Sequence, residues 1–125
     1  KNGMPRAMFL LAQYYHDGNG VQPDWKNYEL WATKAAEAGN SEAMKSLASF
    51  YSGARGNDPA KSLFWLVKAA ENGNAGAMIM LLDVYAYGNT VTPRDKEKLR
   101  YWYDRAKEIG ANPDDFYLDA LKENP

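Results

Sequence analysis

Apolar residues recur along the chain at helical spacing in three separate stretches. In the first stretch they follow the pattern i, i+1, i+4, i+5, i+8, and they are Ala7, Met8, Leu11, Ala12 and Tyr15. This spacing places them on one broad face of a helix. The same pattern returns over residues 43–51 and 77–85. The chain therefore begins with one amphipathic helix that it repeats twice.

A second set of markers recurs with the same period. Trp31 returns as Trp65 and Trp102, at steps of 34 and 37 residues. An aspartate stands seven residues before each tryptophan, where it can cap the start of a helix, and a glycine stands eight residues after it, where it can end one. The aspartates are Asp24, Asp58 and Asp95, and the glycines are Gly39, Gly73 and Gly110. Each repeat is thus predicted to hold a second, antiparallel helix.

These periods predict an all-α solenoid, an α/α superhelix built from stacked helix pairs. We expect one domain over residues 1–125, with repeats at about 4–39, 40–73 and 74–110. We expect large tryptophans and small alanines to fill the space between helices.

The two ends of the chain carry different signals. Residues 1–7 align without a gap on residues 71–77, so Lys1 to Gly3 resemble the tail of another second helix. We therefore expect the chain to be a C-terminal fragment of a longer array, with signal-peptide removal just upstream as the alternative. Near the other end, Asn112 to Asp115 are typical of a capped helix start. They predict a capping helix at about 113–123.

Composition narrows the classes of function. With a net charge of −1 the chain has no overall positive potential to attract phosphate groups, so nucleic acid is not an expected partner. No apolar run reaches the roughly 18–20 residues needed to span a bilayer, so the chain is expected not to be membrane-spanning. The absence of cysteine excludes disulfides and thiolate chemistry, but a periplasmic and a cytoplasmic location both remain open. We expect a monomer.

Three sequence segments resemble a known family. They are Ala-x-x-x-Leu-Ala-x-x-Tyr at 7–15, Gly-x-Gly-Val at 18–21 and Trp-x-x-Lys-Ala-Ala-Glu-x-Gly-Asn at 31–40. The pattern is similar to the Sel-one-like repeat (SLR) family, a relative of the tetratricopeptide repeats. The resemblance implies a right-handed superhelix that acts as a protein-binding scaffold. Bacterial members serve as adaptors in envelope assembly, secretion and host interaction, and some resemble immunity proteins. A cysteine-rich branch is linked to cell-wall or penicillin-like compounds, and this cysteine-free chain does not match it.

The sequence gives little indication of catalytic activity. His16 is the only histidine, so we expect no metal site. No Gly-x-Ser-x-Gly nucleophile turn is present. The Gly18–Gly20 break has neither the preceding strand nor the lysine of a phosphate loop. We therefore expect no cofactor and no enzymatic activity.

The candidate binding residues come from the first helix of each repeat. In tetratricopeptide-like stacking these helices line the concave face, and placing Leu11, Leu47 and Leu81 in the core leaves four positions per helix turned toward that face. The positions are Arg6, Phe9, Gln13, His16, Glu42, Lys45, Ser49, Ser52, Gly76, Ile79, Asp83 and Ala86. They differ between copies while the packing positions persist, although any solvated face would also vary. Phe9 and Ile79 favour a peptide or helix ligand. The interhelical loops with Arg55 and Tyr87 form a second candidate surface.

Three functional hypotheses follow. The first is a non-catalytic scaffold or adaptor that binds another protein, and the second is an immunity protein that neutralises a secreted toxin. A cell-wall or β-lactam-related enzyme is a remote third. An immunity protein should bind one partner tightly and abolish its activity, whereas an adaptor should bind two or more partners and inhibit none.

Overall fold

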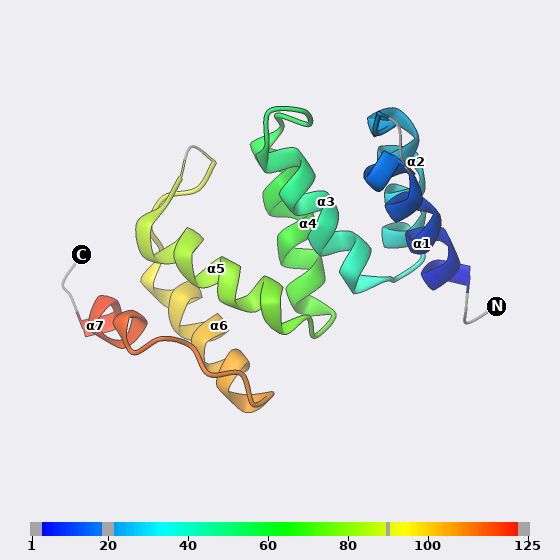
Figure 1. Ribbon diagram of the computed structural model, residues 1–125. Coiled ribbons are helices and arrows are strands. Elements are labelled where there is room, and N and C mark those ends of the chain that lie inside the picture. The colour runs from blue at the N-terminus through cyan, green and yellow to red at the C-terminus, as the bar shows by residue number, and fades with distance from the viewer. Residues whose placement is uncertain (1–3, 19–21, 90, 123–125) are drawn as a thin grey trace.

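The computed structural model describes residues 4–18, 22–89 and 91–122, which form seven helices and no strand (Figure 1). The helices are α1 (Met4–Asp17), α2 (Trp25–Glu37), α3 (Ser41–Ser52), α4 (Pro59–Glu71), α5 (Ala75–Tyr87), α6 (Lys96–Glu108) and α7 (Phe116–Lys122). The prediction of an all-α fold is therefore confirmed. None of the helices in this described part is long and apolar enough to cross a membrane.

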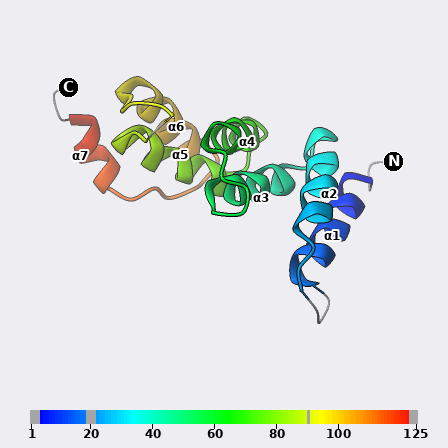
Figure 2. The same cartoon turned by 90° about the horizontal axis from the view of Figure 1, so that it is seen from above.

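The helices stack as consecutive pairs. Helix α1 packs against α2, α3 against α4 and α5 against α6, and the pairs are joined by contacts of α2 with α3 and of α4 with α5. Figures 1 and 2 show the resulting row of pairs, with α1 and α7 at opposite ends. Helix α7 covers the last pair through contacts with α6 and α5. This arrangement is a solenoid of three helix pairs plus a terminal helix.

The recurring aspartates begin the second helices as the sequence predicts. The carboxylates of Asp24, Asp58 and Asp95 accept hydrogen bonds from backbone N–H groups three residues later, at 3.1, 3.1 and 3.0 Å. The bond from the Asn27 N–H is the main reason why the pKa of Asp24 is lowered. Asn40 and Asn74 cap α3 and α5 in the same way. The second helices of all three repeats, and the first helices of the second and third repeats, thus start with the same kind of side-chain cap.

The recurring glycines end the second helices. Gly39, Gly73 and Gly110 have φ values of 102, 88 and 85°. Glycine adopts this left-handed backbone conformation without a steric cost, whereas residues with a Cβ do not. It turns the chain so that the next helix starts two residues later at the first two sites.

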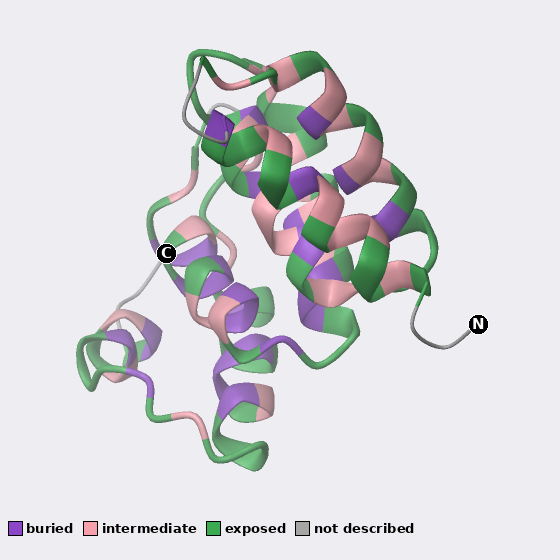
Figure 3. Cartoon of the chain, turned by 45° about the vertical axis from the view of Figure 1, so that its right-hand side comes forward, coloured by how far each residue is buried: buried purple, intermediate pink, exposed green. Residues whose placement is uncertain are grey.

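The core runs through the whole stack (Figure 3). Its largest fully buried side chains are Leu47, Met78, Leu81, Leu82 and Leu99. Consecutive alanines of α2 and α4 are also buried, and their small side chains let the neighbouring helix approach closely. Trp102 is buried, whereas Trp31 and Trp65 are partly buried against the same core. The three tryptophans therefore differ in how much each contributes to packing.

Two sequence predictions fall on residues outside the described ranges. The predicted helix tail at Lys1 to Gly3 is one of them. The other is the part of the Gly-x-Gly-Val motif at residues 19–21.

Candidate protein-interaction groove

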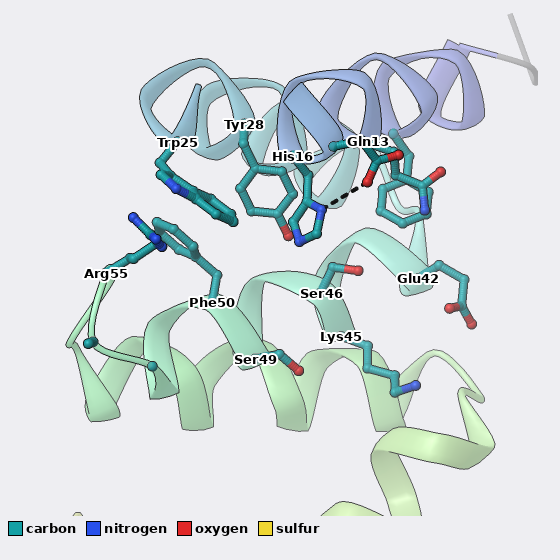
Figure 4. A pocket seen from close by; sticks show the side chains of 14 residues that line it. Gln13, His16, Trp25, Tyr28, Glu42, Lys45, Ser46, Ser49, Phe50 and Arg55 are labelled. Carbon is teal, nitrogen blue, oxygen red and sulfur yellow. Dashed lines mark hydrogen bonds and ion pairs between the residues drawn. The ribbon is translucent and has the colours of Figure 1, made fainter. Parts of the chain in front are cut away.

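A cavity of about 590 Å³ lies between the first helices of the first two repeats. Figure 4 shows that α1 and α2 form one wall and α3 the other. We call this cavity the α1–α3 groove. Its lining residues are Phe9, Gln13, His16, Asp17, Trp25, Tyr28, Glu42, Lys45, Ser46, Ser49, Phe50, Gly53, Ala54 and Arg55.

One end of the groove is aromatic (Figure 4). The His16 ring lies 5.0 Å from the Trp25 ring and 5.4 Å from the Tyr28 ring, both measured between centroids. Phe50 of α3 meets this group from the opposite wall, at 5.4 Å from Tyr28 and 6.0 Å from Trp25. Edge-to-face and stacked contacts of this kind hold aromatic rings in fixed orientations. The aromatic end is therefore preformed.

Tyr28 is the most buried member of this end of the groove, at 4% exposed. Burial raises the pKa of its hydroxyl because the ionised form loses its water, and hydrogen bonding with the Ser46 side chain lowers it in part. Tyr28 thus presents a neutral ring and hydroxyl to the floor of the groove.

Arg55 extends the aromatic end from the loop after α3. Its guanidinium lies 4.6 Å from the centre of the Trp25 ring, within the range of a cation–π contact. The loop approaches closely because Gly56 has no side chain: a Cβ there would stand 2.6 Å from the carbonyl oxygen of Phe50. One cation is thereby held beside the aromatic rings.

The other end of the groove is polar and lies near the start of α5. Glu42 accepts a hydrogen bond of 2.7 Å from Nδ2 of Asn74, the residue that also caps α5. Lys45 lies along Gly76, where a Cβ would stand 3.0 Å from the lysine Cε. Glycine at position 76 therefore leaves room for the Lys45 side chain.

The four charged side chains of the groove differ in their partners. Asp17 lies 3.1 Å from Nδ1 of His16, and Glu42 is bonded to Asn74. By contrast, no carboxylate of the described residues lies within 4 Å of the Lys45 or Arg55 nitrogens. The groove consequently offers two cations without an acidic partner.

The groove brings together six of the twelve candidate binding positions. They are Phe9, Gln13, His16, Glu42, Lys45 and Ser49.

The other six candidate positions, Gly76 among them, lie outside the groove. Arg6 is exposed on α1, and the Ser52 hydroxyl donates a hydrogen bond of 2.8 Å to the carbonyl oxygen of Ser49. Ile79 is partly buried against the core, and Asp83 accepts a hydrogen bond from the Tyr117 hydroxyl of α7. The expectation that Ala86 is an open position of the concave face is wrong, because this residue is buried at 6% exposed. On the first helix of the third repeat, Ala86 is thus buried, whereas Asp83 stays exposed while bonded to α7.

Sequence reasoning missed the aromatic residues that shape the groove. Trp25 stands where the other repeats have Pro59 and Lys96, and Tyr28 stands where they have Ser62 and Leu99. Because both belong to second helices, a search restricted to first helices could not find them. The available signal was the presence of aromatic side chains in the first repeat at positions where the other two repeats have none.

The described residues contain no cluster of side chains that could bind a metal ion. Across residues 4–18, 22–89 and 91–122, no three acidic or histidine side chains gather as metal ligands would. His16 contacts Asp17, but the groove supplies no further carboxylate to the same ring.

The comparisons with known proteins agree with the repeat architecture. The Sel1 repeat profile matches residues 5–40, 41–74 and 76–110. The fold is similar to a Sel1 repeat protein from Oxalobacter formigenes, with 30% identity and a TM-score of 0.72 over 85% of this chain and 44% of that one. It is also similar to c5321, a protective antigen present in uropathogenic Escherichia coli strains that displays an SLR fold. Here the identity is 29% and the TM-score 0.70, over 96% of this chain and 26% of that one.

The chain spans less than half the length of either solved relative. The comparison with curated proteins found no match. Three profile matches cover most of the sequence, and both similar structures carry the same repeat. The chain therefore belongs to the Sel1 repeat family.

Proposed function

We propose that the chain is a non-catalytic scaffold or adaptor that holds a segment of another protein in the α1–α3 groove. Sel1 repeats mediate protein–protein interaction, and both similar structures come from bacteria. The single observation that supports this site is the preformed aromatic end of the groove beside two cations without acidic partners.

The chemistry of the groove favours an acidic segment with an apolar anchor. The rings at one end suit an aromatic or branched aliphatic side chain, which would lose its contact with water there. Lys45 and Arg55 lie at opposite ends of the groove (Figure 4). They favour carboxylates on either side of the anchor, since oppositely charged groups across an interface increase both specificity and association rate.

A peptide-display selection against the purified chain tests this proposal. We expect enriched peptides to carry one large apolar residue flanked by acidic residues. Binding of a selected peptide, measured by titration calorimetry, should weaken about tenfold or more in Lys45→Glu and in Arg55→Glu, which corresponds to about 1.4 kcal/mol. The matched control is Lys68→Glu, since this exposed lysine lies on α4 outside the groove. Selected peptides that are basic, or that bind all three variants equally, would contradict the proposal.

An immunity protein remains the alternative function, because a toxin segment could occupy the same groove. The two roles differ in what happens to the bound partner. An adaptor leaves its partner active and binds more than one protein. An immunity protein abolishes the activity of one partner at a 1:1 ratio. An activity assay of the captured partner with increasing amounts of the chain separates them.

A cell-wall or β-lactam-related activity is the third hypothesis. His16, Asp17, Ser46 and Ser49 all line the groove. Turnover of a cell-wall fragment that is lost in His16→Ala would replace the scaffold proposal with an enzymatic one.

A further inference from the structure

Helix α7 carries an exposed aromatic side chain among acidic residues. Phe116 is 45% exposed. Asp114 and Asp115 come directly before it, Asp119 follows three residues later, and all three are exposed. Residues three apart lie on one side of a helix, so Phe116 and Asp119 share a face. We call Asp114, Asp115, Phe116 and Asp119 the α7 acidic face.

The packing of α7 holds this face toward solvent. Tyr117 and Leu121 belong to the buried core, and the Tyr117 hydroxyl donates a hydrogen bond to Asp83 of α5. The Phe116 ring stacks on the Tyr87 ring, with the two centroids 5.8 Å apart. A side chain that is already held in place loses little conformational freedom when it binds. The α7 acidic face is therefore preformed.

The carboxylates of this face have no cation close to them. Among the described residues, no lysine or arginine nitrogen lies within 4 Å of the carboxylate oxygens of Asp114, Asp115 or Asp119. Asp114 accepts a hydrogen bond of 2.9 Å from the Phe116 N–H, which leaves its charge uncompensated. The face thus combines an apolar ring with negative charge on both sides of it.

The α1–α3 groove has the complementary chemistry. Its aromatic end lies beside Arg55, and Lys45 stands at the other end, both without an acidic partner among the described residues. The ligand proposed for this groove is a large apolar residue flanked by carboxylates. Phe116 between Asp115 and Asp119 is a segment of this kind within the chain itself.

We propose that the α7 acidic face of one copy of the chain docks in the α1–α3 groove of a second copy. Phe116 enters the aromatic end of that groove, and the neighbouring carboxylates face its two cations. Helices α1 and α7 lie at opposite ends of the stack, so the face and the groove that meet belong to different copies (Figures 1 and 2). The inference rests on the ligand chemistry proposed for the groove and names a second copy as its occupant.

Contact between two different surfaces has a consequence for assembly. Each added copy brings a further groove and a further α7 face, so copies join head to tail in an open chain or a closed ring. The monomer expected from the sequence is then the dilute form. Salt weakens the contact because it screens exposed charges. A groove filled by α7 of another copy is closed to other proteins, so self-association regulates binding of the partner.

Sedimentation equilibrium of the chain tests the proposal over a concentration series up to about 1 mM. We expect the average mass to rise with protein concentration and to fall with added salt. Phe116→Ala and Arg55→Glu should each weaken the association about tenfold or more. The matched controls are Phe64→Ala and Lys68→Glu, because both residues are exposed on α4 outside the groove and should leave the association unchanged. Thermal unfolding of each variant verifies that it is folded.

Mixing the two weakened variants tests the head-to-tail arrangement. The Arg55→Glu chain keeps its α7 acidic face, and the Phe116→Ala chain keeps its groove. An equimolar mixture should therefore form a complex of one copy of each, with the affinity of the wild-type contact. The complex should stop at two copies, since its outer groove and outer face both carry a substitution.

Two outcomes would overturn the proposal. One is a chain that remains a monomer up to about 1 mM, and the other is an association that Phe116→Ala and Arg55→Glu leave unchanged. Selected peptides that bind the groove of such a monomer would leave the scaffold function standing. Conversely, self-association that is lost in both variants, in a chain whose groove binds no foreign peptide, would support this inference and contradict the scaffold function alone.

Discussion

The two junctions between successive repeats, α2 with α3 and α4 with α5, share one helix arrangement but differ in their side chains. At the first junction, Trp25 and Tyr28 meet Phe50 across the α1–α3 groove. At the second junction, the corresponding residues are Pro59, Ser62 and Val84.

The hydrogen bonds of the two junctions differ as well. Ser62 donates a hydrogen bond of 2.7 Å to the carbonyl oxygen of Ala48 within its own repeat. Tyr28, at the same position of the first repeat, packs against rings of the neighbouring repeat instead. Tyr51 donates a hydrogen bond of 2.6 Å to Glu29 across the first junction, whereas Leu63 replaces Glu29 at the second. The comparison shows that capping and core residues define the repeat, while a few larger side chains give the first junction its aromatic groove.

The largest expected effect on stability comes from replacing Tyr28 of the first junction by serine, the residue at the equivalent position 62 of the second junction. Tyr28→Ser should lower the free energy of unfolding by about 2–4 kcal/mol, because a buried aromatic ring is removed and a cavity remains. It should also abolish binding of a groove-selected peptide. Denaturant unfolding measures the first effect and calorimetry the second. Phe50→Val makes the same exchange on α3, where the ring is only partly buried, and should cost less. Equal stability of Tyr28→Ser and wild type would mean that the aromatic end is not packed as described.

A smaller effect is expected for the hydrogen bond across the first junction. Tyr51→Phe should cost about 1–2 kcal/mol of unfolding free energy, since it removes a hydrogen bond to a charged group at Glu29. Tyr85→Phe is the matched variant at the second junction, where Leu63 stands in place of Glu29, and it should cost a few tenths of a kcal/mol. Equal costs for the two variants would contradict the difference between the junctions.

Alkaline pH should lower the free energy of unfolding through two tyrosines whose pKa is raised in the folded state, Tyr51 and Tyr117. Burial, followed by the hydrogen bond to Glu29, raises the pKa of Tyr51, and burial, followed by the bond to Asp83, raises that of Tyr117. The folded state therefore holds these phenolic protons more tightly than the unfolded chain does. Their contribution to stability is complete below the unfolded pKa of about 10 and is lost as pH rises through the folded pKa.

The measurement is the unfolding free energy between about pH 9 and pH 11.5. We expect it to fall with increasing pH, and to fall less steeply in Tyr51→Phe. A profile that is flat across this range, or that has the same slope in both proteins, would contradict the assigned burial and bond.

The smallest expected effect is at the polar end of the groove. Gly76→Ala should raise the free energy of unfolding by a few tenths of a kcal/mol, since alanine is the better helix former. It should also weaken acidic-peptide binding severalfold, because the new Cβ displaces the Lys45 side chain. The two effects have opposite signs, so thermal unfolding and calorimetry on one variant separate them. A variant that binds the peptide as wild type does would show that Lys45 takes no part.

Much of the fold could be predicted from the sequence because its signals are local. Asp24, Asp58 and Asp95 cap their helices through bonds that span three residues. Gly39, Gly73 and Gly110 end helices through their own backbone conformation. The period of these signals then defines the stack of helix pairs.

The groove was predictable only in part because it depends on contacts between repeats. Trp25 and Phe50 are 25 residues apart in the sequence, and nothing local to either residue indicates that their rings stack. The hydrogen bond that Asp83 accepts comes from Tyr117 of α7, which lies 34 residues further along the chain. Repeat periodicity gives equivalent positions the same expected environment, whereas α7 at one end and the aromatic residues at the other make the environments differ.

The most direct test of the central claim is site-specific photocrosslinking in cells of the source organism. A photoreactive amino acid is placed at Ser49, which is exposed in the groove, and separately at Asp104, which is exposed on α6 away from it. The scaffold account predicts crosslinks to another protein from position 49, none from position 104, and loss of the position-49 crosslinks when Arg55→Glu is added. Crosslinks from position 104 alone, or position-49 crosslinks that persist in Arg55→Glu, would contradict the account.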